Sequence, residues 1–169
     1  MILDRILEHK KAELRHKNSR GYLADLKTRI RDAGPTLGFA VTLDARRRPE
    51  RPALIAEVKK ASPSLGLLRP EFEQRFEPVR IAEAYREHGA SAVSVLTDKD
   101  FFQGDLTYLA DVKSKVGLPA LNKEFMVADI QFYEARAYGA DAVLLIVAGL
   151  EKRQLIDFSA LAKELSLDV

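Results

Sequence analysis

Two lysines stand at the ends of short apolar runs, where a buried strand would meet solvent. Lys59 closes the run Ala53 to Lys59, and Lys123 lies near the end of the run Ala120 to Phe125. Alternate residues of a strand share a face, so Lys59 shares its face with Glu57. Two charges on one face of a buried strand are costly unless they pair or act on a ligand. The pattern indicates either a functional site or a strand end that emerges into solvent.

Lys123 has apolar neighbours on its own side of the expected strand. Leu121 and Phe125 share its face, whereas Glu124 points the other way, towards the helices, and is expected to be structural. An amine in such a setting can act as a general acid, or as a Schiff-base amine with a carbonyl substrate. The alternative is a surface lysine that extends its ammonium into water.

Hydroxyl and aromatic groups lie in the loops that follow two of these runs. Ser62, Pro63 and Ser64 come shortly after the first run, and the two hydroxyls could donate to phosphate or carboxylate oxygens. The same residues are also common in ordinary turns. A later loop contains Phe101 and Phe102, which could form an apolar wall for an aromatic ligand. Packing against the next helix would explain one phenylalanine more easily than both.

The composition excludes several classes of site. The 169 residues contain no cysteine, so neither a disulfide scaffold nor a thiolate metal site is possible. The three histidines, His9, His16 and His88, fall on polar helix faces, and we expect no metal and no catalytic role for them. A net charge of +2 gives no field that would attract nucleic acid, and no run reaches the roughly 20 apolar residues of a membrane span. We expect a cytoplasmic protein that binds neither nucleic acid nor membrane.

The elements that must position these residues alternate regularly after Pro52. The expected strands are Ala53 to Lys59, Ala92 to Thr97, Ala120 to Phe125 and Ala142 to Val147. The expected helices lie near Pro78 to His88, Leu106 to Lys115, Ala128 to Tyr138 and Glu151 to Leu165. Alternation of strands and helices predicts an α/β fold with a parallel sheet covered by helices.

Helical patterns also precede this unit. Ile2 to Lys17 is amphipathic, Tyr22 to Ala33 has apolar residues at spacings of three and four, and Ala45 to Pro52 is a linker rich in Arg and Pro. We therefore expect residues 1–52 to form an N-terminal helical extension, and residues 53–169 to form a partial barrel within one domain.

The number of βα units predicts an incomplete barrel. A closed eight-stranded α/β barrel needs about 250 residues, whereas four units are visible here, and Leu167 to Val169 has the character of a fifth strand. Catalytic residues of such barrels lie at the C-terminal ends of the strands, which is where Lys59 and Lys123 stand.

Taken together, these motifs resemble the indole-3-glycerol phosphate synthase family. The matching segments are, in chain order, residues 55–64 (IAEVKKASPS), 94–97 (SVLT) with 101–104 (FFQG), 118–119 (LP) with 123–125 (KEF), and 139–147 (GADAVLLIV). The resemblance covers essentially the whole chain. It implies a (βα)8 TIM barrel of tryptophan biosynthesis, a carboxy-lyase that converts 1-(o-carboxyphenylamino)-1-deoxyribulose 5-phosphate to indole-3-glycerol phosphate. It also implies that no cofactor or metal is needed.

The resemblance implies a role for individual residues. Lys123 corresponds to the general acid that protonates the ribulose carbonyl, and Lys59 to a lysine that binds acidic substrate groups and assists catalysis, with Glu57 as its neighbour. Ser62 and Ser64 correspond to a hydroxyl loop beside the substrate carboxylate and phosphate. The apolar pocket for the anthranilate ring corresponds to Pro63, Phe102, Phe125 and Leu144.

The chain departs from the family pattern in three ways. Asn122 and Glu124 stand where the family more often has Arg and Asp, and the stretch Arg69 to Val79 is several residues longer than usual. The family also places a glutamate base and most of its phosphate site in strands five to eight. Two interpretations stay open, the N-terminal part of a synthase or a half-barrel module that needs a second half or self-association. Another phosphosugar barrel, such as an isomerase, fits the Glu-Val-Lys motif less well.

Overall fold

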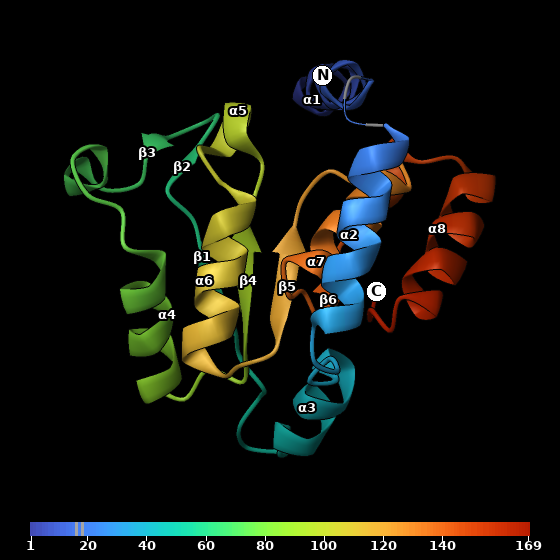
Figure 1. Ribbon diagram of the computed structural model, residues 1–169. Coiled ribbons are helices and arrows are strands. Elements are labelled where there is room, and N and C mark those ends of the chain that lie inside the picture. The colour runs from blue at the N-terminus through green and yellow to red at the C-terminus, as the bar shows by residue number, and fades with distance from the viewer. Residues whose placement is uncertain (16, 18) are drawn as a thin grey trace.

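The computed structural model describes residues 1–15, 17 and 19–169 of the chain (Figure 1). Four strands form a parallel sheet in the order β1 (Ile55–Val58), β4 (Ala92–Leu96), β5 (Ala120–Lys123) and β6 (Ala142–Val143). Neighbouring parallel strands need a crossover connection, which α4 (Pro78–Glu87), α6 (Leu106–Val116) and α7 (Ile130–Ala137) provide. Helix α8 (Lys152–Glu164) follows β6. The expected α/β class with a parallel sheet is confirmed.

The main core lies between this sheet and the helices. Val58, Val93, Val95 and Val143 alternate along their strands and are buried on the helix side, where they belong to one hydrophobic cluster. Figure 1 shows α4 and α6 side by side against the strands. The opposite face of the sheet, called the inner face below, carries the paired side chains of Glu57 and Lys123.

The strands are shorter than expected, most of all the last one. Val147 lies in the 3-10 helix η2 (Val147–Gly149), so the expected strand over Ala142 to Val147 is wrong beyond Val143. An isolated parallel bridge follows α8: Asp168 pairs with Ala142, and its carbonyl accepts from the Val143 amide at 2.9 Å.

Two segments expected to be loops contain regular structure. Residues 61–67 form the hairpin of β2 (Ala61–Ser62) and β3 (Gly66–Leu67), which the 3-10 helix η1 (Pro70–Glu73) follows. After β4 the chain makes the one-turn helix α5 (Lys99–Phe102), because the Asp98 carboxylate accepts from the Phe101 amide at 2.8 Å. The prediction that these two segments are loops is therefore wrong where β2, β3 and α5 form.

The N-terminal segment packs directly on the α/β unit. Its helices are α1 (Ile2–Leu14), α2 (Arg20–Asp32) and α3 (Phe39–Arg46). In Figure 1, α1 lies beyond one end of the strands and α3 beyond the other. Leu7, Leu14 and Leu26 of α1 and α2 pack with Val127 and Ile130 near α7.

Helices α1 and α2 confirm the two expected helical patterns, but α3 was not expected. The segment before the Arg-Pro linker had no assigned structure, and α3 ends inside the predicted linker. His16 lies outside the described residues. No helix in the described part of the chain is long and apolar enough to cross a membrane.

Candidate active site

Glu57 joins the two lysines that the sequence singled out. Its Oε1 lies 2.7 Å from Lys59 Nζ, and its Oε2 lies 2.9 Å from Lys123 Nζ. Strand β4 separates β1 from β5, and in its register Ser94 stands beside Glu57. The small side chain of Ser94 leaves room for the carboxylate to reach across β4 to Lys123. The structure thus brings the three predicted catalytic residues together.

The electrostatics of this cluster favour an anionic ligand. Burial alone would raise the pKa of the Glu57 carboxyl, but hydrogen bonds from Lys59 and Lys123 outweigh burial and lower it. Glu57 is therefore a carboxylate at neutral pH. One carboxylate beside two ammonium groups leaves one positive charge in excess. The side chains are about a third exposed, so both ammonium groups can reach a ligand from solvent.

The surroundings of Lys123 differ from the sequence expectation. Alternation along one strand placed its amine between apolar groups, but the amine is paired with a carboxylate from another strand. Leu121, on the same face, packs instead with Phe39 of α3 at the other end of the inner face. Alternation within a strand gives the face of a side chain but not its partner.

Aromatic rings lie beside the cluster. The ring centroids of Phe102 and Phe125 are 5.9 Å apart, and Phe125 follows Lys123 by two residues. Phe101 turns away and meets the His9 ring of α1 edge-on at 5.4 Å. The two phenylalanines that the sequence grouped therefore belong to different contacts.

At Gly104, just after α5, the backbone passes close to the backbone at the end of β4. A Cβ atom at this position would lie 2.4 Å from the Leu96 carbonyl oxygen. Only glycine allows the loop to turn back so tightly over the end of β4.

The hydroxyl loop forms the tip of the β2–β3 hairpin. Ser62 Oγ accepts from the Leu65 amide at 3.3 Å and lies 3.5 Å from Ser64 Oγ. Pro63 and Ser64 are exposed there. The hydroxyls are thus accessible, and no described contact joins them to Lys59 or Lys123.

Leu144 lies elsewhere on the inner face. With Phe39 and Leu121 it lines an apolar cavity of 500 Å³ beside β6. The described contacts do not join Leu144 to Phe102 or Phe125. The ring pocket stays a prediction, and of its four predicted residues the described contacts join only Phe102 and Phe125.

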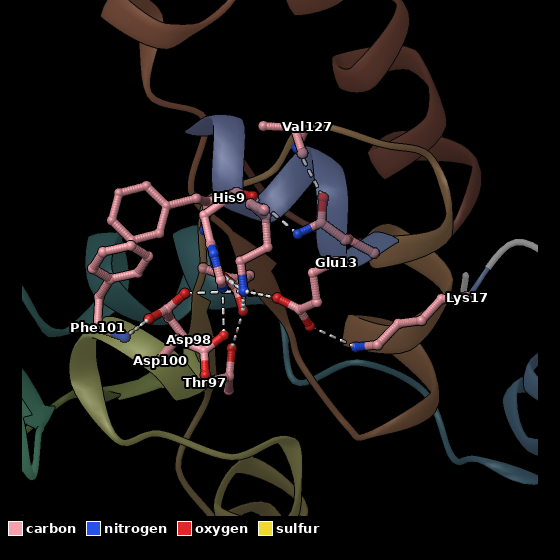
Figure 2. A network of polar contacts seen from close by, with 12 residues as sticks. His9, Glu13, Lys17, Thr97, Asp98, Asp100, Phe101 and Val127 are labelled. Carbon is pink, nitrogen blue, oxygen red and sulfur yellow. Dashed lines mark hydrogen bonds and ion pairs between the residues drawn. The ribbon is translucent and has the colours of Figure 1, made fainter. Parts of the chain in front are cut away.

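A buried polar network that the sequence did not predict lies at the ends of β4 and β5, on the side opposite to Glu57 (Figure 2). Lys10 of α1 is 3% exposed, and its Nζ lies 2.8 Å from Glu13, 2.9 Å from Asp98 and 3.4 Å from Glu124. A signal was present, since Lys10 falls three residues after Leu7 and four before Leu14 on the apolar stripe of α1.

Glu124 points away from Lys123, as expected. Burial raises the pKa of its carboxyl to about 7, and the nearby Asp98 adds to the effect, although Lys10 and the Phe125 amide act against it. The two carboxyl groups at the end of the sheet, Glu57 and Glu124, are therefore shifted in opposite directions.

Among the described residues, one group has the ligand atoms for a metal ion. It consists of His9, Glu13 and Asp100, whose ligand atoms lie within 4.8 Å of one another. His9 Nε2 already contacts Asp100 at 2.6 Å, and Lys10 and Lys17 both bind Glu13. Two ammonium groups on one candidate ligand disfavour a cation, so we interpret the group as ion pairs. His9 thus has a pairing role that the sequence did not indicate.

Comparison with known proteins assigns the family. The family model of indole-3-glycerol phosphate synthase matches residues 3–169. The chain belongs to this family. The match confirms the resemblance carried by the strand-end motifs, and the parallel α/β fold agrees with the TIM-barrel architecture of the family.

Curated relatives support the same assignment. The indole-3-glycerol phosphate synthases of Neisseria meningitidis serogroup B (strain ATCC BAA-335 / MC58) and Neisseria gonorrhoeae (strain NCCP11945) are each 44% identical to the chain over 168 residues. Each match covers 99% of this chain and 63% of the relative. The chain therefore spans less than two thirds of these synthases.

Proposed function

We propose that this chain supplies the cationic and aromatic part of an indole-3-glycerol phosphate synthase site. The observation that carries the proposal is the Glu57 carboxylate, which holds Lys59 and Lys123 together at the end of the sheet. Family membership supports the same reaction, the ring closure and decarboxylation of 1-(o-carboxyphenylamino)-1-deoxyribulose 5-phosphate. The substrate is an acidic phosphosugar, which suits a cluster with an excess positive charge.

The reaction needs a proton at the ribulose carbonyl oxygen. Lys123 donates this proton while the ring carbon that bears the carboxylate bonds to the carbonyl carbon. Loss of carbon dioxide then restores the aromatic ring, and loss of the new hydroxyl together with a proton from the neighbouring methylene carbon releases water and completes the indole. Lys59 binds the substrate carboxylate, and Glu57 keeps both ammonium groups oriented. We assign no cofactor or metal to these steps.

The remaining assigned residues bind and align the substrate. Ser62 and Ser64 donate hydrogen bonds to the carboxylate and phosphate oxygens from the exposed hairpin. An apolar wall that fixes the ring against the carbonyl carbon lowers the entropic cost of ring closure. We assign this wall to Phe102 and Phe125, and we propose that Pro63 of the hairpin and Leu144 after β6 bound the ring from other directions.

We also propose that the sheet is part of a (βα)8 barrel with about four βα units in this chain. Residues 1–52 are its helical extension and residues 53–169 its partial barrel. The bridge of Asp168 to Ala142 supports this arrangement, because it continues the parallel order beyond β6. A cytoplasmic location stays a prediction.

A second candidate function is assembly, in which the inner face pairs with a further half-barrel or a second copy of the chain. The observation in its favour is the apolar cavity beside β6, near which Val147 is 70% exposed. This candidate adds to the enzymatic one, since a completed barrel would serve both.

Turnover of the substrate to the fluorescent indole product tests the proposed function. The purified chain is assayed alone and mixed with the part of the Neisseria meningitidis relative outside the match. We expect Lys123→Ala to lower turnover by about 10²- to 10⁴-fold, the usual contribution of a general acid. The matched control is Lys115→Ala, an exposed lysine of α6. Equal turnover in both variants, or none with either preparation of the unchanged chain, would contradict the proposal.

A further inference from the structure

Lys10 lies within ion-pair distance of the buried carboxylate Asp98 and of Glu124, which is largely buried. Asp98 is fully buried, and its Oδ2 makes no well-aligned hydrogen bond in the described part of the chain, so the ammonium 2.9 Å away compensates its charge. The Glu124 side chain is 11% exposed and lies 3.4 Å from the same ammonium. A buried charge without a partner is strongly unfavourable, so these contacts are tightly coupled.

Each of the two carboxylates also holds the backbone beside the proposed site. The other oxygen of Asp98 accepts from the Phe101 amide at 2.8 Å and so caps α5, the helix that ends with Phe102. Glu124 Oε1 accepts from the Phe125 amide at 2.8 Å. Because Glu124 stands between Lys123 and Phe125, its position fixes the backbone of both.

Further hydrogen bonds near Lys10 join the end of β4 to the end of β5. Thr97 Oγ1 donates to Asn122 at 2.6 Å and lies 3.4 Å from Glu124. The Thr97 amide donates to the Lys123 carbonyl at 3.2 Å. Figure 2 shows Thr97 and Asp98 facing Glu13 of α1 across this network. Helix α1 therefore meets the strand ends through polar contacts centred on one ammonium group.

We propose that Lys10 is a positioning residue of the synthase site, which acts through Asp98 and Glu124 to hold the Phe102 and Phe125 wall and the backbone of Lys123. The inference rests on the proposed function. Lys10 does not contact the substrate, because it lies on the side of the sheet opposite to Glu57 and Lys123. Its role is to keep the ends of β4 and β5 in one arrangement.

The charge of Lys10 can be removed without detaching α1. Leu7 and Leu14 pack in a hydrophobic cluster with Val127 and Ile130, and a Leu7 methyl group lies against Gly149. Helix α1 thus keeps apolar anchors in a Lys10→Met variant. Because burial raises the pKa of Glu124, this carboxyl can take up a proton when the ammonium is absent.

The first measurement is amide hydrogen exchange at Phe101 and Phe125 in the native chain. We expect Lys10→Met to speed exchange at both amides by about 10-fold or more, because their acceptors lose the group that holds them. Lys11→Met, a change at an exposed lysine of the same helix, should leave both amides at the rate of the unchanged chain. Lys10→Arg, which keeps a positive charge, should restore most of the protection.

The second measurement is turnover with substrate in the assay described above. In Lys10→Met, the Phe102 and Phe125 wall and the Lys123 proton donor should be displaced. Because a displacement of about 1 Å can cost about 100-fold in rate, we expect kcat to fall by about 100-fold. We expect KM to change by less than about threefold. Lys10→Arg should recover most of the lost kcat, and Lys11→Met should match the unchanged chain. Loss of folded protein alone would also lower the apparent kcat without changing KM, so kcat is calculated per folded chain, with the folded fraction taken from circular dichroism. A purely structural role would leave kcat per folded chain unchanged.

Two results would overturn the proposal. One is unchanged exchange at Phe101 and Phe125 in Lys10→Met, with faster exchange confined to α1. The other is faster exchange at both amides with an unchanged kcat. Where Lys10→Met fails to fold, the double change Lys10→Met with Glu124→Gln removes one of the two carboxylates that lose Lys10, and the same amides are measured. Lack of turnover in the unchanged chain would instead contradict the proposed function, and the exchange data would still decide whether Lys10 holds the two loops.

Discussion

Glu57 and Glu124, at the end of one sheet, show how the surroundings of a carboxyl group determine the direction of its pKa shift. Glu57 receives hydrogen bonds from Lys59 and Lys123, which lower the pKa of its carboxyl despite its partial burial. Glu124 is more deeply buried and shares Lys10 with other carboxylates, so the pKa of its carboxyl rises to about 7. Glu57 is thus suited to hold cations near a substrate, and Glu124 to couple the fold to pH.

The raised pKa of Glu124 makes stability depend on pH. The folded state binds the proton more tightly than the unfolded state, where the ordinary value of 4.5 applies. This contribution is fully present below pH 4.5 and is lost as pH rises through about 7. Glu124→Gln binds no proton, so the free energy of unfolding of this variant, relative to the unchanged chain, should increase between pH 5 and pH 8. The increase should be at most about 3 kcal/mol.

Urea denaturation followed by circular dichroism at pH 5, 6, 7 and 8 measures this difference. Glu8→Gln on the exposed side of α1 is the matched control, and its difference from the unchanged chain should stay constant with pH. A constant difference for Glu124→Gln as well would show that Glu124 titrates in the folded chain as it does in the unfolded one.

At the scale of helices and strands, the sequence predicted the elements whose pattern of residues is complete within one short segment. The runs around Val58, Val95, Asn122 and Val143 predicted the four parallel strands, because short runs rich in apolar and β-branched residues are visible locally in the sequence. The face of Glu57 and the opposite face of Glu124 followed from alternation along a strand. Alternation thus paired Glu57 with Lys59, whereas the resemblance to the synthase family added Lys123 to the proposed catalytic set.

The missed elements depend on partners far away in the chain. Helix α3 begins where the Leu37 amide donates to Asp141 at 2.6 Å and the Ala40 amide donates to Asp168 at 2.8 Å. These acceptors lie more than 100 residues away, so no local capping signal marked the helix. Lys10 was missed for the same reason, since Asp98 and Glu124 are contributed by two other segments.

The assembly prediction concerns the edge of the sheet at β6. Only Ala142 and Val143 form the strand, and apolar side chains line the cavity beside it. If this edge pairs with a second copy of the chain, the weight-average mass in sedimentation equilibrium should rise with protein concentration. Burial of apolar side chains would drive the association.

A charge placed at the edge tests whether β6 is the contact. Val147→Lys should shift the association to roughly tenfold higher concentration, because a buried ammonium without a partner opposes pairing. Leu65→Lys places the same charge at an exposed position of the hairpin and should have no such effect. A monomer mass for the unchanged chain at every concentration would contradict self-association.

At the scale of the whole molecule, the Glu57 cluster and the Lys10 network both lie at one end of the sheet. The Glu57 cluster lies on the inner face, the Lys10 network lies on the helix side, and α1 contacts the ends of β4, β5 and the segment after β6. Parallel strands make this possible because all of their C-terminal ends meet at the same edge. The proposed reaction depends most on Lys123, which delivers a proton at this edge.

Chemical rescue tests that claim most directly. Lys123 is 37% exposed, so a small amine from solvent can enter the space that Lys123→Ala leaves. We expect turnover by Lys123→Ala to rise in proportion to added ethylammonium, which carries both a positive charge and a transferable proton. Tetramethylammonium carries the charge without the proton and should give no recovery. Equal recovery with both ions, or none with ethylammonium, would contradict the assignment of Lys123 as the proton donor.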